Sequence, residues 1–154
     1  MNVYLIQHGE AEPKNVDPAR SLTEPGRQAV ERVAALAARL DLEVVQIQHS
    51  GKSRAEQTAA ILGQALSPPG GVVAVSGLAP MDDVRPVAGA LAEASHPVML
   101  VGHLPFLARL AGLLVTGDPD SAVVQFQNAA IVCLARQEGR WLAVWILTPQ
   151  MASA

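Results

Sequence analysis

The stretch Val3-Tyr4-Leu5-Ile6-Gln7-His8-Gly9-Glu10 decides the fold. Four consecutive apolar residues that stop at a polar Gln-His-Gly are typical of a strand that is buried on both faces and ends at a loop. We therefore predict a strand over residues 2–7. The short β-branched run Glu43 to Ile47 and the apolar run Pro97 to Val101 are further strand candidates. Three short strands of this kind favour a parallel sheet.

Residues with helical periodicity lie between these strands. Thr23 is an N-cap candidate followed by Pro25, and apolar residues then recur at helical spacing as far as Leu40. The other predicted elements are helices over residues 53–66, 82–94 and 104–115, a strand over residues 72–75, and a hairpin of residues 129–135 with 141–147 across Gln137-Glu138-Gly139-Arg140. This alternation predicts an α/β fold, a three-layer α/β/α sandwich with a mostly parallel central sheet, in one domain over residues 1–154.

Composition excludes several functional classes. The chain has 154 residues, half of them apolar, which is enough to bury a core without metals or disulfides. A net charge of -3 and only five aromatic residues make nucleic acid an unlikely partner. Cys133 lies in an apolar run and is expected in the core, which fits a reducing cytosol. We find no basic leader and no apolar run of about 20 residues, so the expected location is cytoplasmic, without a membrane anchor.

Two tryptophans near the C-terminus admit a simple structural interpretation. Trp141 and Trp145 are four residues apart in a predicted strand, where side chains alternate between faces. We therefore expect both on the same face, packed in the core or at its edge.

Polar clusters follow three of the predicted strands. They are residues 7–10, residues 49–54 and residues 102–105. In open α/β sheets, ligands bind beyond the carboxyl ends of the strands. We therefore expect these clusters to meet at one edge of the sheet.

The residue types in these clusters suit phosphoryl transfer. A neutral His8 imidazole can attack phosphorus, and Gly9 would let the backbone approach the substrate. Arg54 would hold two phosphate oxygens in its planar fork, and a cationic His103 would add charge in the transition state. Taken singly, a histidine at a strand end is more often a satisfied polar residue, and Arg54 a solvated residue at a helix start. Their predicted placement on one edge favours the functional interpretation.

The same motifs, in the same order, resemble the histidine phosphatase superfamily. The matching segments are His8-Gly9-Glu10-Ala11, Arg20-Ser21-Leu22-Thr23 with Gly26, Ser50, Ser53-Arg54-Ala55-Glu56-Gln57-Thr58-Ala59, and Gly102-His103-Leu104-Pro105. The short SixA-type phosphohistidine phosphatases look most similar. The resemblance implies a phosphoglycerate-mutase-like fold, a phosphohistidine intermediate on His8, phosphate held by Arg54 and His103, and no metal or organic cofactor. Arg20 would be a further phosphate contact or a partner in a surface salt bridge.

The chain departs from the family pattern at two places. The family has Arg-His-Gly where this chain has Gln7-His8-Gly9. Glutamine in place of arginine removes one fixed positive charge from the expected phosphate pocket. The family usually has Ser-Pro where this chain has Ser50-Gly51. Gly51 would let this loop, with Ser50, approach the phosphate, and Lys52 or His49 could restore the missing charge. In the alternative interpretation, Lys52 faces solvent and His49 caps the strand end.

The acid that protonates the leaving group is left open by the sequence. Asp82 and Asp83 follow the expected third strand, where larger members of the superfamily place this acid. Glu10 and Glu12 are rivals near His8. Asp82 could equally be a helix N-cap. Residues 125–128, Gln-Phe-Gln-Asn, could add an amide to the pocket.

These observations predict a phosphatase that acts on a phosphohistidine-bearing protein or on a phosphorylated small molecule. The main alternative is a catalytically weak or inactive phosphate-binding protein that recognises a phosphorylated partner, which Gln7 would suit. His8 and His103 argue against this alternative, because a binder needs no nucleophile. The third interpretation is an α/β domain whose histidines have no functional role.

Overall fold

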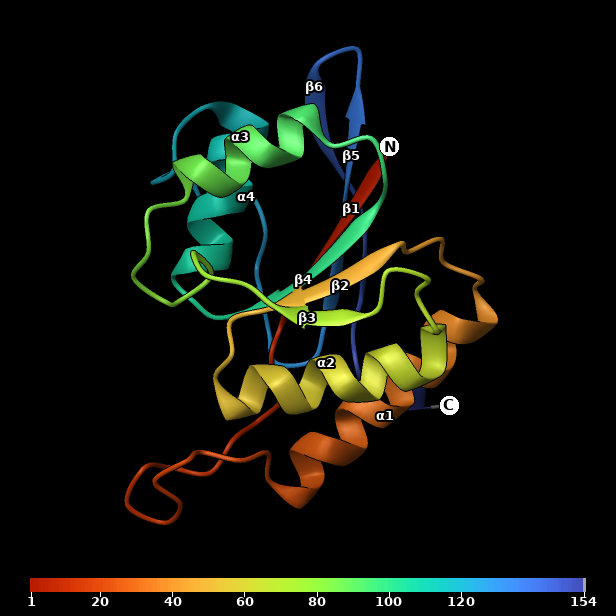
Figure 1. Cartoon of the computed structure of the whole chain (residues 1–154), viewed down its shortest axis with the longest axis vertical. Coiled ribbons are helices and arrows are strands. Elements are labelled where there is room, and N and C mark those ends of the chain that lie inside the picture. Colours follow the sequence, from red (N-terminus) through yellow and green to blue (C-terminus); the bar gives the residue numbers. More distant parts are fainter. Residues whose placement is uncertain (154) are drawn as a thin grey trace.

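The apolar run at the start of the chain forms strand β1 (Asn2–Gln7), which lies in the interior of the sheet. The structure is a computed structural model that describes residues 1–153, and over these residues the sheet has six strands in the order β3-β2-β4-β1-β5-β6 (Figure 1). The other elements are α1 (Glu24–Arg39), β2 (Gln46–His49), α2 (Ser53–Leu66), β3 (Val72–Ala74), α3 (Arg85–Glu93), β4 (Val98–Gly102), α4 (Phe106–Thr116), β5 (Ile131–Gln137), β6 (Arg140–Leu147) and a 3-10 turn (Met151–Ser153).

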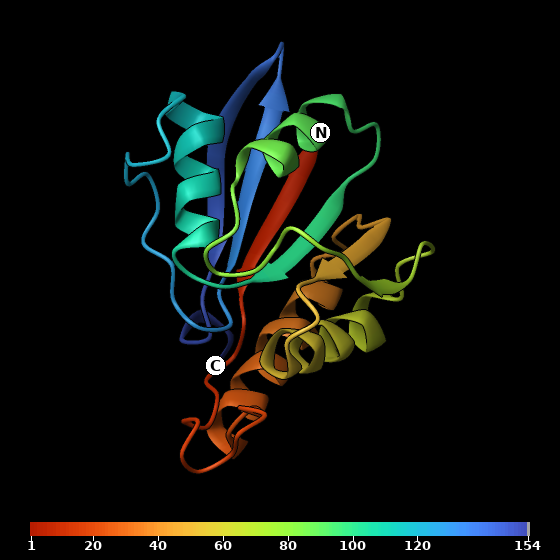
Figure 2. The ribbon, with the colours of Figure 1, turned by 60° about the vertical axis from the view of Figure 1, so that its left-hand side comes forward.

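The sheet is parallel on one side of β1 and antiparallel on the other. β1 pairs in parallel with β4, β4 with β2, and β2 with β3. β5 is antiparallel to both β1 and β6. Helices α1 and α2 cover one face, and α3 and α4 cover the other (Figures 1 and 2). The predicted three-layer sandwich is therefore confirmed.

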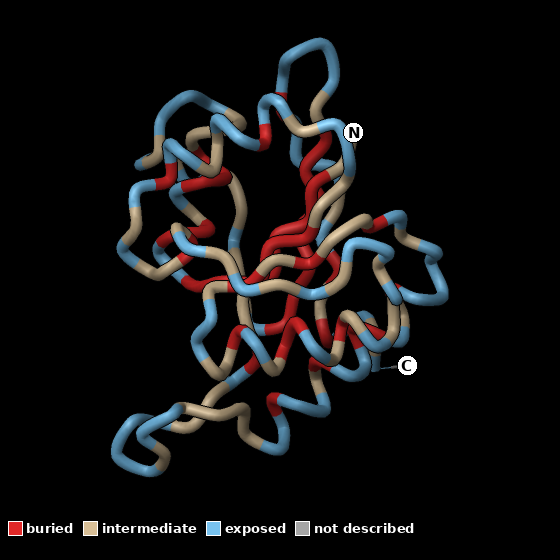
Figure 3. Tube along the Cα trace, viewed as in Figure 1, coloured by how far each residue is buried: buried red, intermediate tan, exposed pale blue. Residues whose placement is uncertain are grey.

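Strand β1 is buried on both faces because its side chains alternate between two core clusters. Tyr4 and Ile6 pack in the cluster under α1 and α2. Val3 and Leu5 pack in the cluster under α3 and α4. The buried central strands between the two helical layers are visible in Figure 3. Burying apolar side chains on both sides of the sheet supplies most of the driving force for this fold.

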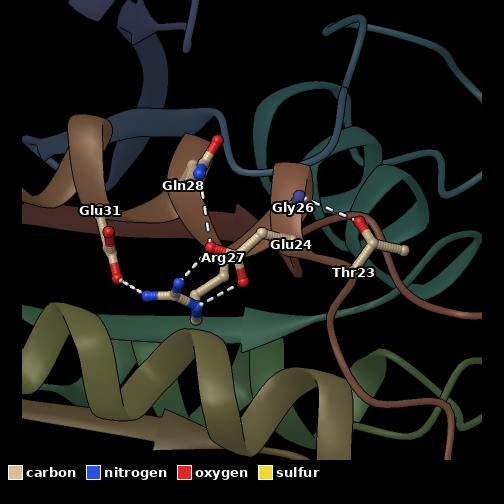
Figure 4. Close-up of polar contacts among 6 residues, drawn as sticks. All are labelled: Thr23, Glu24, Gly26, Arg27, Gln28 and Glu31. Atoms are coloured by element: carbon tan, nitrogen blue, oxygen red, sulfur yellow. Dashed lines mark hydrogen bonds and ion pairs between the residues drawn. The ribbon is translucent and has the colours of Figure 1, made fainter.

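Helix α1 begins where the sequence predicted. The side-chain oxygen of Thr23 accepts a hydrogen bond from the backbone N–H of Gly26 at 3.0 Å, which caps the helix (Figure 4). In the next turns, Arg27 forms ion pairs with Glu24 and Glu31. These pairs are about half exposed, so we expect them to add little stability.

The observed starts of β2, α3 and α4 differ from the predicted ones. β2 begins at Gln46 rather than Glu43, because its partner β4 starts at Val98 and Gln46 is the first residue opposite it. α3 begins at Arg85 rather than at residue 82. α4 begins at Phe106 rather than at residue 104. Before α3, Asp82 accepts a hydrogen bond from the N–H of Ala79 and so belongs to a turn.

The predicted hairpin of β5 and β6 is confirmed. Its two-residue turn, Glu138-Gly139, has φ of 52° and 75°, as the right-handed twist of a tight hairpin requires. Both tryptophans pack in the core or at its edge, as predicted, but the prediction that they share a face was wrong. Trp145 lies beside Tyr4 at the cluster of α1 and α2, with the two rings tilted by 43°, whereas Trp141 packs in the opposite cluster. A bulge shifts the register, since Cys133 faces Trp145 but Leu134 faces Ala143, and this extra residue reverses the alternation.

Cys133 is buried in β5, as predicted, and burial raises the pKa of its thiol to about 11. Within residues 1–153, none of the helices has both the length and the apolar character needed to cross a membrane.

A packing prediction follows from Gly26, in the first turn of α1. A Cβ at Gly26 would lie 2.2 Å from the carbonyl oxygen of Glu10, a backbone atom that cannot easily move. We expect Gly26→Ala to lower the free energy of unfolding by about 1–3 kcal/mol or more. Gly89→Ala in α3 is the matched control, because its Cβ would meet nothing within 4 Å. The control should raise stability slightly. Urea denaturation of both variants measures the difference, and equal effects would contradict this interpretation.

Candidate active site

Two histidines meet at the carboxyl ends of the adjacent parallel strands β1 and β4. Gln7 pairs with Gly102, so His8 and His103 each lie one residue beyond the paired ends. The backbone N–H of His8 donates to the carbonyl of Gly102 at 3.0 Å, which keeps the two ends together. The centres of the two imidazole rings are 5.1 Å apart and the rings are tilted by 54°. Strand pairing therefore brings together two residues that are far apart in the sequence.

His8 is held as a neutral ring with its lone pair on Nε2. Its Nδ1 lies 2.7 Å from the carbonyl oxygen of Gly9. A carbonyl oxygen can only accept, so Nδ1 carries the proton and Nε2 carries the lone pair. Burial lowers the pKa of His8, the hydrogen bond to Gly9 raises it, and the nearby charges of Arg54 and Arg20 lower it further. The net lowering leaves Nε2 of His8 unprotonated and nucleophilic at neutral pH.

Two arginines supply positive charge beside this nitrogen. Arg54, in the first turn of α2, donates from Nε to Nε2 of His8 at 3.3 Å. Arg20 lies in the loop before α1 and donates from Nε to the carbonyl of Glu12 at 3.1 Å. Both arginines and both histidines line a pocket of about 350 Å³. Burial and the charge of Arg20 lower the pKa of Arg54, as expected where two guanidinium groups share a confined site.

His103 is almost completely buried, with 2% of its surface exposed. Its Nε2 lies 2.6 Å from the hydroxyl oxygen of Ser50. Burial is the main cause that lowers its pKa, to about 3, followed by the charges of His8, Arg54, Lys52 and Arg20. At this pKa the ring is neutral at neutral pH, in contrast to the cationic His103 that the sequence suggested.

Two amide side chains also line the pocket. Asn128, which precedes β5, donates from Nδ2 to the carbonyl of His8 at 2.8 Å. The amide anticipated from residues 125–128 is therefore Asn128, whereas Gln127 pairs with Gln150. Gln7 lines the pocket as well, and its buried Oε1 has no hydrogen-bond partner among residues 1–153.

The residues suggested as compensation for Gln7 lie outside the pocket lining. Lys52 is exposed at the start of α2. His49 is buried, and its Nδ1 accepts a hydrogen bond from the N–H of Gly51 at 3.1 Å. Ser50 contacts His103 rather than the pocket itself. Arg20 and Arg54 are thus the two cationic side chains of the pocket lining.

Gly9 is also needed for packing between the loop after β1 and α1. A Cβ at this position would lie 2.8 Å from Cγ2 of Val30 and 3.1 Å from the carbonyl oxygen of Gly26, both in α1. The glycine therefore allows the loop after β1 to pack closely on α1.

The acid candidates separate into two places. Glu10 lines the pocket, and its Oε1 accepts a hydrogen bond from the hydroxyl of Thr23 at 2.7 Å. Asp82 and Asp83 line a neighbouring cavity of about 560 Å³, which also touches Pro80 at the rim of the first pocket. Asp83 accepts a hydrogen bond from the N–H of Arg85. Glu10 is thus the acid candidate that lines the same pocket as the histidines, while both aspartates take part in the turns before α3.

Sequence reasoning missed the role of Thr58, which is fully buried in α2. Its Oγ1 accepts a hydrogen bond from the N–H of Gly9 at 3.0 Å and donates to the carbonyl of Arg54 at 2.8 Å. Thr58 therefore ties the loop that carries His8 to the turn that carries Arg54. The sequence did contain one indication of this role, since Thr58 places a hydroxyl four residues after Arg54 on the buried face of an alanine-rich helix.

Ala11, Pro80 and Leu104 complete the pocket lining.

A nucleophilic imidazole, two guanidinium groups and a carboxyl group around one pocket can bind a tetrahedral oxyanion and attack its central atom. Within residues 1–153, histidine, cysteine and carboxylate side chains do not gather in groups of three that could hold a metal ion.

Solved structures resemble this chain over nearly its whole length. The protein histidine phosphatase SixA complexed with tungstate is 27% identical, with a TM-score of 0.86, over 97% of this chain and 98% of that one. A protein from Agrobacterium tumefaciens assigned as a phosphohistidine phosphatase SixA is 23% identical, with a TM-score of 0.75, over 96% and 97% of the two chains. A mycobacterial glucosyl-3-phosphoglycerate phosphatase complexed with VO3 is 18% identical, with a TM-score of 0.70, over 94% and 98%. Comparison with family models and with curated proteins found no match.

Proposed function

We propose that this chain, which belongs to the histidine phosphatase superfamily, is a phosphatase that works through a covalent phosphohistidine intermediate on His8. The observation that carries the proposal is the polarised His8 ring. Gly9 fixes the proton on Nδ1, and Nε2 lies next to Arg54 in a pocket with a second arginine. The structural neighbours support it, since they include phosphatases, two of them solved with oxyanions.

The reaction has two steps. In the first, Nε2 of His8 attacks phosphorus, the bond from phosphorus to the leaving oxygen or nitrogen breaks, and the leaving atom takes a proton. Arg54 and Arg20 stabilise the equatorial oxygens as their charge is redistributed. In the second, water attacks the phosphorus of phosphohistidine, the P–N bond breaks, and His8 returns with its lone pair on Nε2. Glu10 is the pocket carboxyl group that can exchange the proton in both steps.

The substrate class that we propose first is a phosphohistidine-bearing protein, with phosphorylated small molecules as the second. The structural neighbours named for phosphohistidine support this order. An imidazole nitrogen is a good leaving group once it is protonated, so this substrate needs less help from a dedicated acid. A catalytically inactive phosphate binder is not favoured, because the pocket keeps a nucleophile as well as its anion-binding side chains.

Phosphate release tests the proposed function. The wild-type protein is incubated with phosphoimidazole, which has the P–N bond of phosphohistidine, and with p-nitrophenyl phosphate, whose leaving group is similar in basicity. We expect multiple turnovers with both substrates and a larger kcat/KM for phosphoimidazole. Binding of both compounds with no release of phosphate would instead establish the inactive binder.

The Gln7→Arg variant tests what the missing charge does. His49 and Lys52 do not line the pocket, so the structure offers no local replacement for a third cation there. We therefore expect Gln7→Arg to raise kcat/KM for p-nitrophenyl phosphate by about 10–10²-fold, by analogy with one added charge-assisted contact in a transition state. Gln127→Arg, beside Asn128 but outside the pocket lining, is the matched control. A decrease in Gln7→Arg would mean that the pocket is built around the glutamine.

A further inference from the structure

The two nitrogens of the His103 ring have different surroundings. Nε2 lies 2.6 Å from the hydroxyl oxygen of Ser50, which follows β2. Nδ1 is buried and has no hydrogen-bond partner among residues 1–153. Buried polar atoms in folded proteins nearly always have a partner, so an unpaired nitrogen in a residue that lines a ligand pocket needs an explanation. Since Ser50 occupies Nε2, Nδ1 is the nitrogen of this ring that remains free to contact a ligand.

The direction of the hydrogen bond between Ser50 and His103 decides what Nδ1 can offer. The Ser50 oxygen also accepts, at 3.4 Å, from the backbone N–H of Lys52. Because the Ser50 oxygen accepts from Lys52, its hydroxyl proton is available to be donated to His103. If Ser50 donates to Nε2, then Nε2 holds the lone pair and a neutral ring must carry its proton on Nδ1.

Burial and the surrounding charges keep the His103 ring neutral in the free protein. After burial, four nearby groups lower its pKa. They are His8 in the loop after β1, Arg54 in the first turn of α2, Lys52 in the loop after β2, and Arg20 in the loop before α1. A neutral imidazole can donate to phosphate from only one nitrogen. Its contribution to anion binding therefore depends on which nitrogen is protonated.

We propose that Ser50 is a positioning residue, whose hydroxyl donates to Nε2 of His103 and so fixes the His103 proton on Nδ1, where it donates to a phosphoryl group bound beside His8. The role of the phosphoryl group rests on the proposed function, whereas the position of the proton does not. This assigns Ser50 a role through His103, in place of the direct phosphate contact expected from the sequence.

Nitrogen-15 NMR of the labelled protein tests the proposal directly. The chain has four histidines, and comparison with a His103→Gln spectrum identifies the His103 signals. We expect a protonated, pyrrole-like Nδ1 and a pyridine-like Nε2 in the wild type. Ser50→Ala should shift the ring toward a mixture of tautomers, and Ser50→Thr, which keeps the hydroxyl, should shift it back. A wild-type ring protonated on Nε2 would overturn the proposal, even if Ser50→Ala failed to fold.

Titration with inorganic phosphate connects the tautomer to binding. We expect Ser50→Ala to weaken phosphate binding by about tenfold, the effect of one hydrogen bond in a confined site. Ser76→Ala is the matched control, because Ser76 lies in the loop after β3, as Ser50 lies in the loop after β2, but is exposed and outside the pocket lining. Equal phosphate affinity in Ser50→Ala and wild type would also overturn the proposal. A wild type with the expected tautomer but no phosphatase activity would contradict the proposed function alone.

Discussion

Replacing His8 with alanine is expected to lower kcat for phosphoimidazole and for p-nitrophenyl phosphate by more than about 10³-fold. The variant keeps the pocket and both arginines but has no atom that can form the bond to phosphorus, and loss of a covalent nucleophile is among the largest single-residue effects in catalysis. Stopped assays of phosphate release, at enzyme concentrations high enough to detect residual turnover, measure the loss.

His96→Ala is the matched control, because this histidine is exposed in the loop before β4. It should retain wild-type turnover. A His8→Ala variant that kept more than about a tenth of wild-type activity would exclude His8 as the nucleophile, and attention would move to direct attack by water.

The pH dependence of the wild type provides an internal check on His8. Burial lowers the pKa of this ring below its usual value, so the nucleophilic form persists at pH values somewhat below that value. Activity should therefore be retained at neutral pH and lost on the acid side, as pH falls through the lowered pKa and Nε2 is protonated.

Replacing Arg54 with alanine is expected to lower kcat/KM by about 10²–10³-fold. Arg54 lies beside the attacking nitrogen, at 3.3 Å from Nε2 of His8, and lines the pocket with Arg20. The variant lacks the bidentate guanidinium donor that stabilises charge in the transition state. Loss of such a donor typically reduces rates by this amount.

Arg54→Lys keeps the charge without the planar fork, so it should recover only part of the loss. Arg32→Ala, on the exposed surface of α1, serves as the control for removal of an arginine. If Arg54→Ala and Arg32→Ala had the same steady-state constants, Arg54 would not be part of the phosphate site.

The fold was largely predictable because its main determinants are local in sequence. Residues 2–7 form a strand because both faces of this apolar run can be buried, and residues 53–66 form the predicted helix within the same bounds. The placement of Trp145 was not predictable. It depends on a bulge in the pairing of β6 with β5, which becomes visible only when the two strands are aligned. The start of β2 was missed for a similar reason, since it is set by where β4 begins.

The centre of the site was predictable and its periphery was not. The sequence predicted that His8 and His103 share one edge, because both follow strands of a parallel sheet. Their direct contact depends on β1 and β4 being neighbours, which only the structure shows. Lys52 and Asp82 belong to a loop and a turn, and His49 ends β2 next to that loop. The direction of these side chains depends on local hydrogen bonds such as those of Gly51 with His49 and of Ala79 with Asp82. Thr58 has a role only because α2 packs against the loop after β1.

The most direct test of a phosphohistidine intermediate on His8 is a rapid-quench experiment with labelled acetyl phosphate or phosphoramidate. Wild type and His8→Ala are quenched in base on the millisecond scale and the protein-bound label is counted. We expect protein-bound label that is acid-labile and base-stable on the wild type alone, and we expect it to appear before phosphate is released. Phosphate release by the wild type without any bound label, or equal label on His8→Ala, would contradict this expectation.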